Sequence, residues 1–99
     1  MPLSNERKKQ FRSIGHKLNP VVTIAGNGLS EGVLAELDRA LEDHELIKVK
    51  LMIADRDTRR QCAAELLRQT GALSIQEIGK VLLIYRAAKR PNARLSNIV

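Results

Sequence analysis

Apolar residues recur along this 99-residue chain in two rhythms, one typical of helices and one typical of strands. In three segments they return every three or four positions, as they do on one face of a helix. The first segment ends at Asn19-Pro20, because proline disfavours a helical residue before it. The second begins at Ser30, a candidate N-cap, and the third ends at Gly71, which suits a left-handed C-terminal cap. The pattern therefore predicts helices over residues 4–17 and 30–44, and from a turn at 55–58 to residue 70.

Four shorter segments have the composition of strands, over residues 21–24, 46–53, 72–78 and 80–86. The second is the clearest, since its apolar residues alternate with Lys48 and Lys50. Gly79-Lys80 suits a tight hairpin turn between the last two. The final strand is apolar on both faces, so we expect it to be central or covered on both sides. The order α-β-α-β-α-β-β predicts an α/β fold, a compact sandwich in which helices pack a four-stranded mixed sheet.

The positive charge of the chain is concentrated at its two ends. The net charge is +6, made of +4 on residues 1–20, −3 on 21–54, +1 on 55–71 and +4 on 72–99. Such a chain is expected to bind an acidic partner, on a face built where its ends meet. Solvated surface charge is the alternative interpretation. The basic residues expected on this face are Arg7, Lys8, Arg12, Lys17, Lys80, Arg86, Lys89 and Arg90.

A glycine-rich turn, Ala25-Gly26-Asn27-Gly28, separates a predicted strand from a predicted helix. Backbone N–H groups at such a turn lie beside the positive end of the helix dipole and can hold phosphate. The alternative is a turn that merely needs the conformational freedom of glycine. The loop lacks the lysine and the Ser/Thr spacing of a P-loop, which favours a polynucleotide backbone over a nucleoside triphosphate. Aromatic residues make up only 2% of the chain, which favours recognition of backbone and shape over stacking on bases.

Other classes of protein are disfavoured by the sequence. No apolar run approaches the ~20 residues that span a membrane, and the charged N-terminus is unlike a signal peptide, so we expect a cytoplasmic protein. Cys62, the single cysteine, is interpreted as a small core residue. The acidic run 42–45 is interpreted as a solvated helix end, and Asp55 and Asp57 as candidate caps. We therefore expect no catalytic site, no metal and no cofactor.

The motifs taken together resemble the CRM domain, the small RNA-binding module of bacterial YhbY-type proteins and plant organellar splicing factors. The matching segments are HKLNPVV at 16–22, GNGLSEGV at 26–33, EDHELIKVK at 42–50, TGA at 70–72 and IGKVLLIYR at 78–86. The resemblance implies a fold similar to the C-terminal domain of bacterial initiation factor three, and RNA binding through a GxxG loop. In this chain the loop falls on residues 25–28, with Ala25 at its first position. Ala25 would be strained if that position needed a positive φ.

These observations lead to a functional hypothesis with two alternatives. Residues 1–86 are predicted to form a single CRM-like RNA-binding domain, and residues 87–99 a basic C-terminal extension with a frayed end. The resemblance implies a non-catalytic protein that binds ribosomal RNA of the large-subunit precursor during ribosome assembly. A monomer is favoured. The alternatives are a metal-dependent RNA-processing enzyme that uses Asp55 and Asp57, and a protein–protein adaptor that uses the acidic face of the helix at 30–44.

Overall fold

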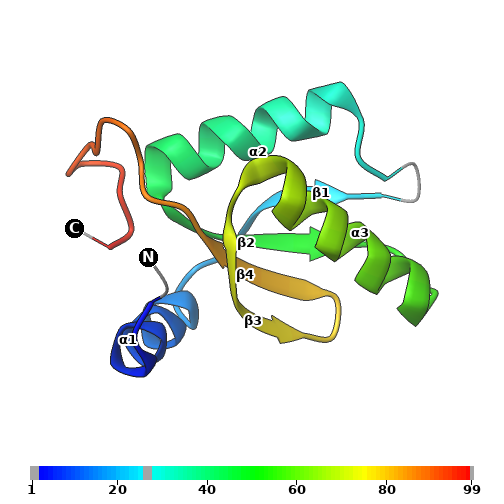
Figure 1. Ribbon diagram of the computed structural model, residues 1–99, viewed down its shortest axis with the longest axis horizontal. Coiled ribbons are helices and arrows are strands. Elements are labelled where there is room, and N and C mark those ends of the chain that lie inside the picture. Colours follow the sequence, from blue (N-terminus) through cyan, green and yellow to red (C-terminus); the bar gives the residue numbers. More distant parts are fainter. Residues whose placement is uncertain (1–2, 26–27, 99) are drawn as a thin grey trace.

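The computed structural model describes residues 3–25 and 28–98, and its elements follow the predicted order (Figure 1). The predicted α/β class and the four-stranded mixed sheet are confirmed. The elements are α1 (Asn5–Gly15), β1 (Pro20–Ile24), α2 (Glu31–His44), β2 (Leu46–Leu51), α3 (Arg56–Thr70), β3 (Leu73–Ile78) and β4 (Val81–Tyr85).

The helix ends are set by short-range hydrogen bonds that the sequence encodes. Side chains of Ser4, Ser30 and Asp55 accept backbone N–H groups in the first turns of α1, α2 and α3, as N-caps do. Gly71 closes α3 with φ 72°, the predicted left-handed cap. Helix α1 ends two residues earlier than predicted, because the N–H groups of Lys17 and Leu18 donate to carbonyls three residues back and tighten the chain toward β1.

The sheet has the strand order β1-β2-β4-β3. Strands β1 and β2 are parallel, and the other two pairs are antiparallel. The doubly apolar strand β4 lies between two neighbours, as predicted. Strand β2 ends at Leu51 rather than at Ile53. Beyond its end, the N–H of Met52 donates to the carbonyl of Ile24 at 2.8 Å.

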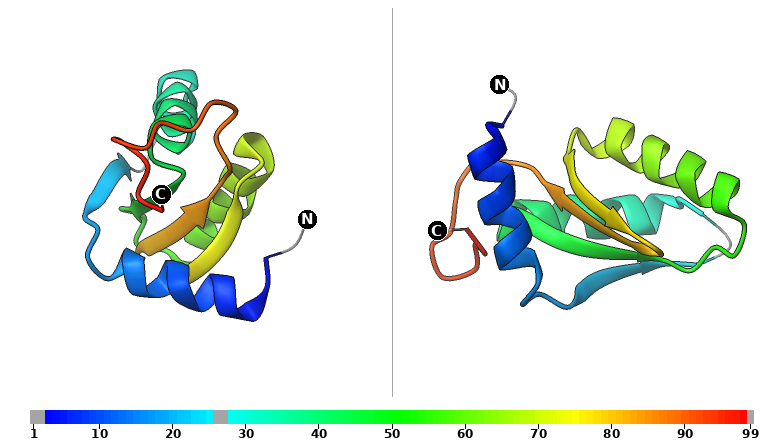
Figure 2. Two further views of the ribbon diagram at one scale, coloured as in Figure 1. Left: turned by 90° about the vertical axis from the view of Figure 1, so that its left-hand side faces the viewer. Right: turned by 90° about the horizontal axis from the view of Figure 1, so that it is seen from below.

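Helices cover the two faces of the sheet unequally (Figure 2). One face packs against both α2 and α3 and forms the larger core, which includes Leu37, Leu41, Val49, Leu66 and Ile84. Of the described helices, α1 covers the other face, around a smaller core of Phe11, Leu46, Ile75 and Leu83.

Gly15 lets α1 approach this face closely. A Cβ atom at Gly15 would lie 2.6 Å from the Cδ2 atom of Leu83, so a larger residue would push the helix away from the sheet. The close approach brings Phe11 into full burial beside Leu83.

The C-terminal segment folds back over the end of α2. The Nδ2 group of Asn97 donates to the carbonyl of Leu46 at 2.7 Å, and Ile98 packs against the smaller core together with Leu3. The expectation of a frayed end is therefore wrong as far as Ile98, and residues near both ends of the chain pack against the smaller core. No helix in the described part of the chain combines the length and apolar character needed to cross a membrane.

Candidate nucleic-acid interface

The loop after β1 lies at the opposite end of the molecule from the chain ends (Figures 1 and 2). Strands β1 and β2 are parallel, so their carboxyl ends share one edge of the sheet. The β3–β4 hairpin reaches the same edge, where the N–H of Leu51 donates to the carbonyl of Lys80 at 2.7 Å. Lys80 therefore belongs with the loop, and α1 and the C-terminal segment do not.

The loop closes as a tight turn between its first and last residues. The N–H of Gly28 donates to the carbonyl of Ala25 at 3.0 Å, and Gly28 has φ 75°. Among the described residues, Glu45 is the only non-glycine residue with a positive φ, so the strain considered for Ala25 does not arise. Gly26 and Asn27, which were also expected to bind, lie outside the described residues. At the start of α2 beyond the turn, the first N–H groups have no intrahelical acceptor.

Helix α1 presents basic residues on the side of the sheet that it covers. The guanidinium of Arg7 lies 4.7 Å from the ring centroid of Phe11 and also donates to Gln10 at 3.1 Å. Lys8 and Arg12 are half-buried on the same helix, and Lys17 is exposed just after it. All four residues lie in α1 or directly after it, and the first turn of the helix also carries one acidic residue, Glu6.

Tyr85 belongs to the packing under α1. Its ring centroid lies 4.7 Å from that of Phe11 with the planes tilted by 38°. Burial, and then the carboxylate of Glu45, raise the pKa of its hydroxyl. Tyr85 is therefore part of the packing around the smaller core.

Part of the sheet face beside α1 carries no helix. The open sheet face, as we name it, extends from the end of α1 toward the loop edge. The strand register places its residues on the side opposite the larger core. None of them is acidic. They are Thr23, Lys48, Lys50, Gln76, Ile78 and Val81.

Lys48 and Lys50 were absent from the predicted site. The alternation in β2 already placed them opposite the buried residues Ile47 and Val49, but their position between α1 and the loop depends on the packing of α1. They lie between the basic residues of α1 and the loop edge. From the sequence, the basic face was instead expected to form where the two ends of the chain meet.

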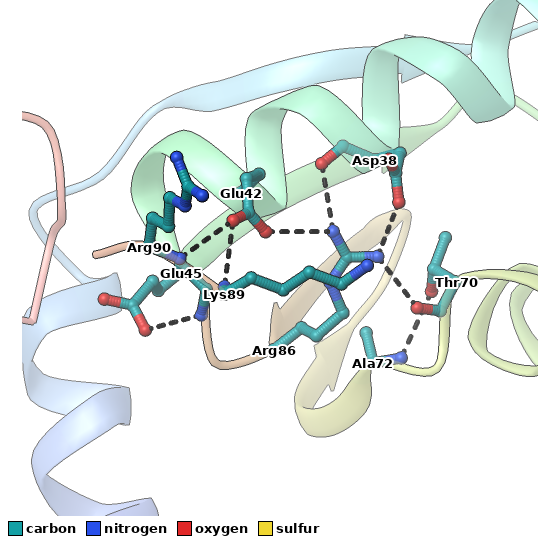
Figure 3. A network of polar contacts seen from close by, with 9 residues as sticks. Asp38, Glu42, Glu45, Thr70, Ala72, Arg86, Lys89 and Arg90 are labelled. Atoms are coloured by element: carbon teal, nitrogen blue, oxygen red, sulfur yellow. Dashed lines mark hydrogen bonds and ion pairs between the residues drawn. The ribbon is translucent and has the colours of Figure 1, made fainter. Parts of the chain in front are cut away.

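Arg86 is held inside a polar network on the other side of the molecule (Figure 3). Its Nη1 atom lies 2.7 Å from Oδ1 of Asp38 and donates to the carbonyl of Thr70 at 3.0 Å. Its Nη2 atom donates to the Asp38 carbonyl at 3.1 Å and lies 3.8 Å from Oε2 of Glu42. These contacts hold the guanidinium of Arg86 against α2 and the end of α3.

The exposed residues Lys89 and Arg90 lie in the same acidic surroundings. Their backbone N–H groups donate to Oε1 of Glu42 at 2.8 and 3.2 Å. The structure thus separates Arg86, Lys89 and Arg90 from the loop and does not form the single patch expected of all eight basic residues. Asp38 and Glu42, which belong to the acidic face of α2 considered for an adaptor, hold this segment in place.

Three arginines at the start of α3 lie at the loop edge and were also missed. Arg59 donates from Nη1 to the carbonyl of Ile53 at 2.9 Å, whereas Arg56 and Arg60 are exposed. They line a hollow with Gly79 and one acidic residue, Glu77. Their position follows from β1 and β2 being parallel, because the segments after parallel strands emerge at one edge.

Of the two residues considered for catalysis, Asp55 is the N-cap of α3 and Asp57 lies in the first turn of that helix. Asp55 accepts the N–H of Thr58 at 2.8 Å and its hydroxyl at 2.6 Å, and these bonds hold the pKa of Asp55 below its ordinary value. Across residues 3–25 and 28–98, no group of three or more His, Cys, Asp or Glu side chains is arranged to hold a metal ion. Cys62 packs against the larger core, and burial raises the pKa of its thiol.

Comparison with known proteins identifies the family. The CRS1 / YhbY (CRM) domain model matches residues 3–86, so the chain belongs to this family. It is 59% identical to "Probable RNA-binding protein PA4753" of Pseudomonas aeruginosa over 99% of this chain and 94% of that one. It is 45% identical to an "RNA-binding protein" of Haemophilus influenzae over 94% of each chain. The solution structure of SAV1595 from Staphylococcus aureus, described as a candidate RNA-binding protein, superposes with a TM-score of 0.77 at 31% identity, covering 95% of this chain and 97% of that one.

Proposed function

We propose that this protein is a non-catalytic RNA-binding protein whose interface runs from α1 across the open sheet face to the loop at residues 25–28. The observation that carries the proposal is the one-sided charge. The basic side chains of α1 and of β2 share one side of the sheet, and the acidic residues of α2 lie on the other. Phosphate contacts dominate the affinity of such surfaces for nucleic acid. The relatives named as RNA-binding proteins support the same partner.

Within this interface, α1 contributes Arg7, Lys8, Arg12 and Lys17, and the loop edge contributes Lys80 with the turn that Ala25 and Gly28 close. The N–H groups at the start of α2 offer phosphate a partial positive charge without a side chain. Arg86, Lys89 and Arg90 are left out of the proposed interface, because the carboxylates beside them repel phosphate. No cofactor or metal is required for this mode of binding.

The target that fits the family best is ribosomal RNA of the large-subunit precursor, bound by a monomer in the cytoplasm during ribosome assembly. A surface of backbone contacts with few aromatic residues suits a structured RNA, whose phosphates are held at fixed positions. Ultraviolet crosslinking in cells, followed by sequencing of the bound RNA, tests this target. Enrichment of large-subunit precursor RNA is expected, and reads spread over messenger RNA without that enrichment would overturn the assignment.

The proposal of a non-catalytic role is tested separately. Oδ2 of Asp55 accepts both hydrogen bonds from Thr58, which supports a capping role for this carboxylate. A labelled RNA incubated with the protein and magnesium or manganese is expected to remain intact. Cleavage that is lost in Asp57→Asn would restore the nuclease hypothesis.

A further inference from the structure

We propose that the open sheet face seats one unpaired RNA base in a hollow beside the end of α1. This inference rests on the proposed function and deepens it, since it assigns a part of the interface that recognises a base rather than a phosphate. The hollow has a volume of about 200 Å³. It is lined by His16, Lys48, Gln76, Ile78, Val81 and Leu83, and is called the sheet hollow below.

The hollow exists because α1 stops short. Gly15 anchors the last turn of the helix on Leu83, and His16 follows directly as its C-cap. Beyond this point, Val81 and Ile78 continue the apolar surface of the smaller core without a helix above them. Ile78 keeps 59% of its surface exposed, the largest exposed fraction among the large hydrophobic residues in the described part of the chain. An apolar surface left open on a basic face marks a place where a partner binds.

The side chains around this apolar floor fit the chemistry of a nucleotide. A base has a flat surface that gains from leaving water and an edge that both donates and accepts hydrogen bonds. The amide of Gln76 does both, and the ring of His16 has a donor and an acceptor when neutral. Lys48 supplies positive charge for the phosphate that a base carries with it.

The charge around the hollow favours RNA over a protein partner. Lys50 pairs in register with Val81 of the hollow, and Lys17 follows directly on His16. The acidic residue of the neighbouring strand, Glu77, points to the opposite face, because its register partner Leu82 belongs to the larger core. The hollow also lies between α1 and the loop edge, so a strand held at both places crosses it. A base seated there would set the register of the RNA, which phosphate contacts alone do not do.

The experiment compares RNA with and without bases. Affinities are measured by fluorescence anisotropy for labelled 12-nucleotide adenylate, cytidylate and uridylate oligomers, and for a 12-unit abasic ribose-phosphate chain of the same charge. Removal of about 40 Å² of apolar surface from water corresponds to about a five-fold gain in affinity. We expect at least one of the three oligomers to bind about five-fold more tightly than the abasic chain.

Two variants at opposite ends of β3 localise this difference. Ile78→Ser removes the exposed side chain of the hollow, and Leu73→Ser removes a side chain that is 41% exposed at the other end of the strand. Ile78→Ser is expected to abolish the five-fold preference, and Leu73→Ser to preserve it. In NMR spectra of the wild-type protein, the methyl signals of Val81 and Leu83 should shift with the oligomers and not with the abasic chain.

The outcomes separate this inference from the proposed function. Equal affinity for the abasic chain and all three oligomers, or a preference that survives Ile78→Ser, would overturn the base site while leaving a phosphate-binding protein. Failure to bind the four probes, while structured RNA of the large-subunit precursor still binds, would overturn the base site alone. Failure to bind that RNA as well would overturn the proposed function itself. Binding of an acidic, apolar peptide at the same methyl groups with higher affinity than every RNA would assign the hollow to a protein partner instead.

Discussion

Arg86 and Asp38 stand 48 positions apart in the sequence, yet the guanidinium of one lies 2.7 Å from the carboxylate of the other. The pair joins the end of β4 to the middle of α2. Arg86 was expected to bind RNA from its charge, but its guanidinium contacts other parts of the protein. It also donates to the carbonyl of Thr70 at the end of α3. One arginine thus joins two helices to the central strand.

Replacement of Arg86 by methionine is expected to destabilise the fold without changing RNA affinity. The side chain is only 21% exposed, and its loss leaves the Thr70 carbonyl without this partner, at about 1–3 kcal/mol. Urea unfolding measures the loss. The matched variant Asp38→Asn should lose less than 1 kcal/mol, since that carboxylate is 69% exposed. A large drop in RNA affinity with unchanged stability in Arg86→Met would return this residue to the interface.

Gly28→Glu is expected to weaken RNA binding, because it places a negative charge at the turn that we propose binds phosphate. A side chain at φ 75° also costs about 1–2 kcal/mol of stability. Gly71→Glu is the control, since Gly71 has φ 72° and, like Gly28, has open space where a Cβ would be. Both variants should lose similar stability, and only Gly28→Glu should lose affinity in an anisotropy titration. Equal affinities of the two variants would remove the loop from the interface.

Asp55 is expected to make stability depend on pH in the acid range. Hydrogen bonds from Thr58 lower the pKa of Asp55 in the folded state below 3.8. The stabilisation is therefore present above that value and lost as the pH falls through the folded pKa. Asp55→Asn keeps an N-cap acceptor but does not titrate, so its urea midpoint should vary less between pH 5 and pH 2. Identical acid profiles for the two proteins would contradict the assignment of the cap.

Glu45→Gln is expected to loosen the C-terminal segment. The carboxylate is 4% exposed, with one oxygen accepting the hydroxyl of Ser96 at 2.9 Å and the other the N–H of Ala88 at 2.9 Å. Loss of hydrogen bonds to a buried charge costs about 1–3 kcal/mol. Hydrogen exchange over residues 88–98 should accelerate in this variant and not in Glu36→Gln, an exposed position of α2. Unchanged exchange in Glu45→Gln would show that the segment is held by other contacts.

Local signals in the sequence were sufficient for most of the fold. Ser30 and Gly71 bounded helices because their capping depends on nearby backbone alone, and the apolar residues on both faces of β4 identified the central strand. The turn after α1 was missed. There the N–H groups of Lys17 and Leu18 donate to carbonyls three residues back, which replaces a further turn of α-helix.

The candidate site was less predictable, because its parts come from segments far apart in the chain. Basic residues were found by their charge, but charge does not reveal a partner such as Asp38, which pairs with the guanidinium of Arg86. Lys48 was passed over as one residue of an alternating strand. Only the placement of α1 on one end of the sheet turns it into a connection between α1 and the loop edge.

The central claim is that RNA binds the α1 side of the sheet and not the C-terminal segment. The most direct test removes two positive charges from each place and measures how affinity for a single-stranded 12-nucleotide uridylate varies with salt. Contact with about five phosphates gives a slope of log K against log salt near −3.5, and each lost contact reduces it by about 0.7. Lys48→Ala/Lys50→Ala is predicted to bring the slope to about −2.1, and Lys89→Ala/Arg90→Ala to leave it unchanged. The reverse result, with the slope lowered only by the C-terminal pair, would contradict the account.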